Sequence, residues 1–241
     1  FVPSLVIAIF ARVCNKKIVW SVRGELEEGA LNFKRRIKVF YLFIIKRIIN
    51  KDFVFHCTSE SEVANTRNIF ATQNTVKIPN YIKLPKKYNL PIKKQILYLG
   101  RIHPIKNLES LIKGLAKVKS FKEKKYFLMI AGTGSAKYLK KLNLLIDELD
   151  LREAVVFLGM VTGEKKEKLL AESYMLVLPS FSENFGNVVV ESLSQSTPVI
   201  ASFGTPWEVL EERGAGYWVD SSVHSLAESI ERLLSLDQEE Y

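Results

Sequence analysis

Residues 176–202 read LVLPSFSENFGNVVVESLSQSTPVIAS, and the fold prediction starts from them. The stretch opens with an apolar run that ends at a proline, and it closes with a second apolar run. Both runs have the length and character of buried strands. The residues between them predict a turn and then a helix that starts near Gly186. The stretch therefore predicts one strand–helix–strand unit.

The same alternation continues on both sides of this unit. In the first third of the chain, the helical stretches are residues 31–50 and 59–70, and the second opens with a capping box of Ser59 and Glu62. The predicted strands are residues 16–22, 52–59, 75–80, 95–100, 126–131, 154–158, 174–179, 197–201 and 216–219. Short apolar strands that alternate with helices indicate an α/β fold with parallel sheets covered on both faces. Ligands of such sheets bind at the carboxyl ends of the strands.

Residues 79–94 separate two groups of these units. The segment contains three prolines and several lysines, and it cannot continue a helix or a central strand. We predict a first domain at residues 1–84, a linker at residues 85–94 and a second domain at residues 95–241.

Composition sets wider limits on the function. With 241 residues and 47% hydrophobic residues, the chain can bury a sizeable core. Its net charge of +9 favours anionic partners. Cys14 and Cys57 form no metal or redox motif, which is typical of a reducing compartment. The chain begins at Phe1 rather than Met, so we expect further residues upstream.

Two glutamates stand at the mouth of the strand–helix unit. Seven residues separate Glu183 from Glu191, but the same spacing recurs in lysine-rich and terminal helices, where a solvated surface is the better interpretation. Glu183 differs because it follows a strand and a loop. Glu191 would lie one turn after Asn187 in a helix whose free N–H groups suit an anion. The alternative, a loop residue and a helix-surface residue, remains open.

Three other strand ends carry candidate binding residues. Arg101 and Lys106 could hold a diphosphate, or they could be two exposed basic residues. Gly132 and Gly134 allow the backbone to pass close to another group, or they form a tight turn. After the strand that ends at Gly159, the backbone of Met160 and Val161 could face a nucleobase; these two residues are donor-binding candidates.

These segments together resemble a known family. LYLGRIHPIKNLESLI (97–112), IAGTGS (130–135), VVFLGMV (155–161) and residues 176–202 are similar to the donor domain of the retaining glycosyltransferases of family 4. IVWSVRGELEEGALNFKRRIK (18–38) and HCTSESE (56–62) resemble the second half of the acceptor domain of that family. The resemblance implies two Rossmann-like domains of the GT-B type. It also implies that the start of the acceptor domain and the C-terminal return helix are missing from this chain.

The resemblance assigns roles residue by residue. Arg101 and Lys106 match the pair that binds the donor diphosphate, Glu191 matches the carboxylate on the donor ribose, and Glu183 matches the carboxylate at the donor sugar. The loop whose backbone contacts the sugar and phosphates corresponds to Phe185, Gly186 and Asn187. Many members carry His-Gly where this chain has Arg23 and Gly24. We expect a donor or acceptor contact there, or an ion pair of Arg23 with Glu25 or Glu27.

The activity implied is transfer of a sugar from a nucleotide diphosphate donor, with retention and without a metal or another cofactor. The acceptor would be a saccharide or a lipid-linked saccharide of the cell envelope. We expect a cytoplasmic protein at the inner face of the membrane, and no nucleic-acid partner. A sugar-nucleotide epimerase, a glycosidase and a non-catalytic nucleotide-sugar-binding or membrane-docking module remain alternatives.

Residues 32–51, NFKRRIKVFYLFIIKRIINK, form a basic and apolar stretch without an acid. Its uninterrupted apolar run is too short to span a bilayer, and its apolar residues lie nearly all round a helical wheel. The stretch is therefore either a helix buried in the first domain or a docking surface for acidic lipid head groups.

Overall fold

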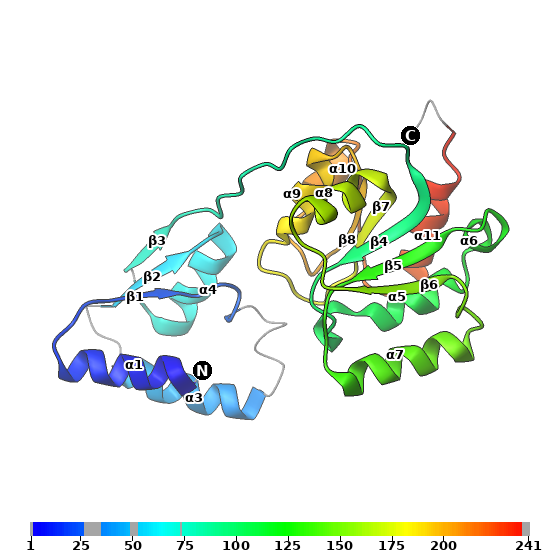
Figure 1. Cartoon of the computed structure of the whole chain (residues 1–241). Coiled ribbons are helices and arrows are strands. Elements are labelled where there is room, and N and C mark those ends of the chain that lie inside the picture. Colours follow the sequence, from blue (N-terminus) through cyan, green and yellow to red (C-terminus); the bar gives the residue numbers. More distant parts are fainter. Residues whose placement is uncertain (1, 27–34, 49–52, 73, 238–241) are drawn as a thin grey trace. The chain divides into compact units, whose positions relative to one another are not determined.

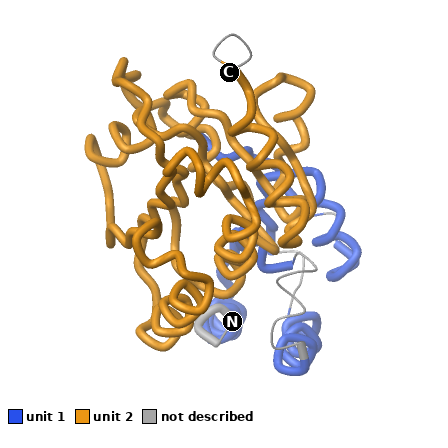
Figure 2. Tube along the Cα trace, turned by 90° about the vertical axis from the view of Figure 1, so that its right-hand side faces the viewer, with its two compact units in different colours: residues 1–81 blue, residues 82–241 orange. Residues whose placement is uncertain are grey.

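The computed structural model describes residues 2–26, 35–48, 53–72 and 74–237. The chain divides into two compact units, residues 1–81 and residues 82–241, which Figure 2 shows in different colours. Each unit has a parallel sheet of its own. The units are therefore described one at a time.

Unit 1 is a small parallel sheet with helices. The strands β1 (Ile18–Ser21), β2 (Phe53–Cys57) and β3 (Thr75–Lys77) pair in the order β1-β2-β3. The helices are α1 (Val2–Val13), α3 (Arg35–Ile48) and α4 (Glu60–Phe70), and α1 lies beside α3 (Figure 1). Alternate residues of β2 are buried because the side chains of a strand point to opposite faces.

Aromatic side chains form much of the core of this unit. Phe55 of β2 stacks on Trp20 with ring centroids 5.9 Å apart and on Phe70 at 4.8 Å. From α3, Tyr41 and Ile45 are buried in the same cluster. One side of α3 therefore packs against the sheet.

Unit 2 is a doubly wound α/β domain. Its six strands are all parallel and follow the order β6-β5-β4-β7-β8-β9. They are β4 (Lys93–Leu99), β5 (Phe127–Ala131), β6 (Val155–Gly159), β7 (Ser173–Leu178), β8 (Val199–Ser202) and β9 (Gly216–Val219). The strand order reverses between β4 and β7. In such sheets the crevice at this point, outside the carboxyl ends of the strands, is where ligands bind.

Helices cover both faces of this sheet. Ile96 and Tyr98 of β4 point into one core cluster, and Leu97 points into the other. The first cluster is covered by α5 (Leu108–Leu115), α6 (Lys119–Glu123), α7 (Ala136–Glu148) and α11 (Val223–Leu234). The second is covered by α8 (Gly163–Glu172), α9 (Asn187–Ser194) and α10 (Val209–Glu212). Figure 1 shows α5 and α7 below the sheet and α8 and α9 above it.

The predicted fold class, α/β with parallel sheets, is confirmed. Each predicted strand is present, and its bounds differ from the prediction by at most three residues. Helix α1 was not predicted, and its residues are almost all apolar. The described part of the predicted helix 31–50 is α3, and the rest of that range lies outside the described residues.

The predicted linker, residues 85–94, runs along unit 2. The buried Gln195 side chain accepts a hydrogen bond from the N–H of Tyr88 (2.9 Å) and donates one to the carbonyl of Lys86 (2.9 Å). Lys87 donates to the hydroxyl of Ser196 at 2.8 Å, and β4 already begins at Lys93. These bonds attach the segment to the C-terminal end of α9.

Candidate functional site

The loops that follow β4 and β5 fit together through two glycines. A Cβ atom on Gly132 would lie 1.8 Å from the carbonyl oxygen of Gly100, and one on Gly134 would lie 2.3 Å from that of Ile102. Gly132 also has a φ of +148°, which side chains rarely adopt. The predicted close approach of backbone is present, and the group approached is the loop that carries Arg101.

Arg101 stands at the carboxyl end of β4. The hydroxyl of Tyr98 donates to the carbonyl of Arg101 at 2.8 Å and fixes the backbone there. Burial, and then the carboxylate of Glu183, raise the pKa of Tyr98, so the hydroxyl remains a donor. The Arg101 side chain is exposed, and no hydrogen bond or ion pair holds its guanidinium within the described residues. Its charge is available to a ligand.

Lys106 lies a few residues on, in a short 3-10 helix, η1 (Pro104–Lys106). The ring of His103 accepts the N–H of Ile105 and so begins this helix. Burial, followed by the charges of Arg101 and Lys106, lowers the pKa of His103. The Lys106 ammonium forms an ion pair with the carboxylate of Glu183. Two predicted site residues that are 77 positions apart are thus in contact.

The loop after β7 holds Glu183 in place. The N–H of Phe181 donates to the carbonyl of Ile105 (2.9 Å), and the N–H of Glu183 donates to the carbonyl of Gly204 (2.8 Å). Gly186 has a φ of +76° and stands at the N-cap of α9, which therefore begins at Asn187 as expected and has no side-chain cap. The dipole of a helix is positive at this end.

Trp207 supports the same loop, and its role was not predicted. Its indole N–H donates to the carbonyl of Phe185, and the two rings meet edge to face at 5.1 Å. The side chain is buried in the core beside α9. Sequence patterns gave no signal for this bond, because Trp207 follows β8, the next strand of the sheet.

Glu191 is one turn into α9, and it too has a lysine partner. Lys166 of α8 donates to Oε1 of Glu191 at 2.7 Å, and both side chains are partly buried. Lys166 was not predicted, because it lies in a lysine-rich helix that was interpreted as solvated surface. Its position three residues after Gly163 places it near the end of β6, where Met160 is exposed and Val161 is partly buried.

The candidate residues of unit 1 lie in a turn after β1. Arg23 and Gly24 have φ values of +44° and +75°, and a left-handed arginine is strained. The buried Glu62 carboxylate accepts the N–H of Gly24 (2.5 Å) and the N–H of Thr58 (2.6 Å). Among the described residues Arg23 forms no ion pair; Glu27 lies outside them.

The structure confirms one half of the predicted capping box and corrects the other half. Ser59 caps α4 as expected, since its hydroxyl accepts the N–H of Glu62 at 3.1 Å. The Glu62 carboxylate bonds Thr58 and Gly24 in place of the backbone of Ser59. A buried carboxylate needs several donors, and the turn after β1 supplies one of them. Glu62 therefore fixes the Arg23 turn.

Two further observations concern metals and membranes. Among the residues that the structure describes, no three His, Cys, Asp or Glu side chains gather as metal ligands would. Within the same residues, none of the helices combines the length and the apolar character needed to cross a bilayer.

Two units, each with a parallel sheet, define an α/β protein, and its neighbours among solved structures have the GT-B fold. Residues 81–241 match the family Glycosyl transferases group 1, and the chain belongs to this family. An uncharacterized glycosyltransferase of Methanocaldococcus jannaschii is 36% identical over 146 residues, which are 59% of this chain and 36% of the relative. The O-antigen chain mannosyltransferase of Salmonella typhimurium is 28% identical over 168 residues, 68% of this chain and 46% of the relative.

Solved structures agree on the fold. The crystal structure of Anabaena HepE in complex with UDP and glucose superposes with a TM-score of 0.81 at 19% identity. The match covers 99% of this chain and 67% of HepE. The chain thus spans two thirds of that structure and less than half of the two curated relatives.

Proposed function

We propose that this chain is part of a retaining glycosyltransferase of family 4 that binds a nucleotide diphosphate sugar at the strand ends of unit 2. The observation that carries the proposal is the convergence of charged side chains where the strand order reverses. Lys106 meets Glu183 there, Arg101 is exposed beside them, and α9 begins at Asn187. The complex of HepE with UDP and glucose supports such a ligand.

The charges suit the chemistry of transfer. When the bond between sugar and phosphate breaks, the nucleoside diphosphate gains negative charge. Arg101, Lys106 and the positive end of α9 are in place before the reaction begins, so they can stabilise that charge as it develops. We therefore propose that no metal or other cofactor is needed. Arg101 would supply a fork of N–H donors, and Lys106 a point charge.

The two glutamates take separate tasks in this proposal. Glu191 binds the ribose hydroxyls through Oε2, while Lys166 holds Oε1. Glu183 faces the donor sugar, where its carboxylate binds a hydroxyl or stabilises positive charge at the anomeric carbon. Phe185, Gly186 and Asn187 contribute backbone to the sugar and phosphates. Gly132 and Gly134 shape the neighbouring loop, and the nucleobase lies at Met160 and Val161.

For the acceptor we propose a saccharide or lipid-linked saccharide of cell-envelope synthesis, reached from the cytoplasmic side of the membrane. The relative named as an O-antigen chain mannosyltransferase supports this class. The turn of Arg23 and Gly24 would contact the donor or the acceptor from unit 1. Nucleic acid has no part in the proposal.

The melting temperature with UDP, GDP, ADP and CMP tests the donor site. A ligand at 100 times its dissociation constant adds about 2.7 kcal/mol to the free energy of unfolding. We expect one nucleoside diphosphate to raise the melting temperature, and the Arg101→Ala/Lys106→Ala double variant to lose the rise. If none of the four nucleotides stabilises the wild-type chain, this chain does not form a donor site.

A further inference from the structure

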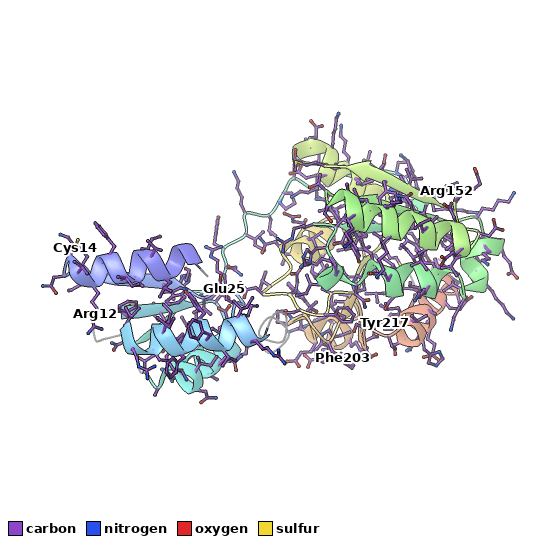
Figure 3. All side chains as sticks on the ribbon, turned by 90° about the horizontal axis from the view of Figure 1, so that it is seen from below. Arg12, Cys14, Glu25, Arg152, Phe203 and Tyr217 are labelled. Atoms are coloured by element: carbon purple, nitrogen blue, oxygen red, sulfur yellow. The ribbon has the colours of Figure 1, made fainter. Side chains whose placement is uncertain are left out.

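A short turn brings Lys106 to the candidate donor site, and neighbouring loops hold this turn. Lys106 is only 9% exposed although it carries a charge, and its ammonium pairs with the carboxylate of Glu183. The N–H of Phe181, in the loop after β7, donates to the carbonyl of Ile105 at 2.9 Å. The loop after β8, where Figure 3 labels Phe203, holds the loop of Glu183 through a backbone bond. The backbone around Lys106 therefore sets its position.

His103 and Asn107 close the two ends of this turn. Asn107 follows η1 with a left-handed φ of +54°, and its side-chain amide donates to the carbonyl of Ser221 at 2.8 Å. His103 precedes η1 with extended backbone, and its Nδ1 accepts the N–H of Ile105 at 3.2 Å. A helix leaves its first N–H groups without partners, and a side chain that accepts one of them stabilises the helix. The histidine ring is therefore the N-cap of the turn that carries Lys106.

The cap bond exists only while the ring of His103 is neutral. A neutral imidazole has one nitrogen that accepts and one that donates, whereas both nitrogens of an imidazolium are donors. Because Nδ1 accepts the N–H of Ile105, the proton of the neutral ring lies on Nε2. Protonation of Nδ1 would place two donors face to face and break the bond.

The surroundings of His103 favour this neutral form. Partial burial, and then the positive charges of Arg101 and Lys106, lower the pKa of the ring. Lys106 in turn pairs with Glu183 from the loop after β7. An aspartate, which is a common N-cap, would place a negative charge beside the two cations and would repel an anionic ligand. A neutral histidine caps the turn without adding that charge.

We propose that His103 is a positioning residue of the candidate donor site: its ring caps η1 and thereby holds the Lys106 ammonium where the donor diphosphate binds. This inference rests on the proposed function, since it assigns a task within the same site. It has two consequences that are measured separately. The stability of the chain depends on whether the ring can accept the N–H of Ile105, and the affinity for a diphosphate depends on the cap.

Melting temperatures without nucleotide test the cap itself. At about pH 8 we expect His103→Ala to melt about 2–4 °C below the wild type, because an N-cap is lost. His103→Asn should melt with the wild type, since asparagine also caps helices and does not titrate. The pKa of the ring is lowered in the folded chain, so its contribution to stability is complete above the ordinary pKa of about 6.5 and is lost as the pH falls below that value. At about pH 5.5 the wild type should therefore melt below His103→Asn.

Nucleotide affinity tests the position of Lys106. At about pH 8, where the ring is neutral, we expect His103→Ala to raise the dissociation constant of the stabilising nucleoside diphosphate about fivefold. That of the corresponding nucleoside monophosphate should change by less than about twofold, because this ligand lacks the terminal phosphate of the diphosphate that Lys106 is proposed to bind. His103→Asn should restore the wild-type values. His224→Asn is the matched control, since this histidine is exposed on α11 and should change neither value.

Two outcomes would overturn the inference while the donor site stands. One is a nucleoside diphosphate that binds the wild type and His103→Ala equally, because the ring would then have no effect on Lys106. The other is a His103→Asn variant that binds as weakly as His103→Ala, because the ring would then act in another way than as a cap. If no nucleotide binds the wild type, the donor site itself fails, and this inference fails with it.

Discussion

At the scale of single residues, the candidate donor site consists of two lysine–glutamate pairs. Lys106 holds Glu183, and Lys166 holds Glu191. Each lysine comes from a different element than its partner, so each pair also fixes where a carboxylate points. Pairs that are partly buried are screened less than surface pairs. We infer that Lys166 orients Glu191 toward the ribose and leaves its second oxygen for the hydroxyls.

This role leads to a prediction about Lys166→Met. Loss of one charge-assisted hydrogen bond costs about 1.5–3 kcal/mol of free energy. Only part of this loss weakens the binding of the nucleotide. We expect the dissociation constant of the stabilising nucleoside diphosphate to rise by about fivefold or more. The dissociation constant of the corresponding nucleoside monophosphate should rise by the same factor, because both ligands carry the ribose. Titration calorimetry measures both values.

Lys168→Met serves as the control for this change. Lys168 lies two residues along the same helix and pairs with Glu164 at the surface. Its removal should leave both dissociation constants within about twofold, since exposed pairs contribute little. Tighter nucleotide binding by Lys166→Met would contradict the prediction, because Lys166 would then compete with the ribose for Glu191.

At the scale of elements, the loop after β7 depends on the loop after β8. The indole of Trp207 bonds the carbonyl of Phe185, and Gly204 accepts the N–H of Glu183. Trp218 holds the carbonyl of Thr205 at 3.0 Å in the same loop system. The loop that presents Glu183 is thus attached to the next strand of the sheet.

Trp207→Phe tests this support. A smaller phenyl ring replaces the indole and the bond to the Phe185 carbonyl is lost; the loss of the bond alone costs about 1 kcal/mol of folding stability. We expect a fall of about 2–4 °C in melting temperature and about a fivefold loss of nucleotide affinity. Trp218→Phe loses the same kind of bond at Thr205. Its melting temperature should therefore fall as well, but its affinity for the nucleotide should stay unchanged. If both variants lose affinity equally, Trp207 has no specific effect on the Phe185 loop.

The sequence predicted elements better than contacts. Strands such as β4 and β7 are short apolar runs, and a parallel sheet buries them on both faces. Helix α1 was also missed, and apolar residues lie on its exposed side as well as on its buried side. Lys166, Trp207 and the bond of Glu62 to Gly24 were missed for another reason. Their partners lie on other elements, and a pattern along the chain does not show which side chains meet across the fold.

At the scale of the whole molecule, a segment without helix or strand connects the two units in the chain. Residues 78–92 form no helix or strand. Within this segment Lys86 and Tyr88 are bonded to Gln195 of unit 2, whereas Tyr81 is 89% exposed. Exposed and unbonded segments are where proteases cut first. We therefore expect the residues just before Lys86 to be cleaved first.

Brief digestion with chymotrypsin examines this division. We expect the first cut at Tyr81 and a resistant fragment that contains α11, because unit 2 has a core of its own and six paired strands. The fragment should keep the melting-temperature rise with the nucleoside diphosphate, since Arg101, Lys106 and Glu191 all lie on it. Gln195→Ala should extend cutting toward Tyr88, because the bonds at Lys86 and Tyr88 are lost. A fragment that unfolds on cleavage would show that unit 2 depends on unit 1 for its stability.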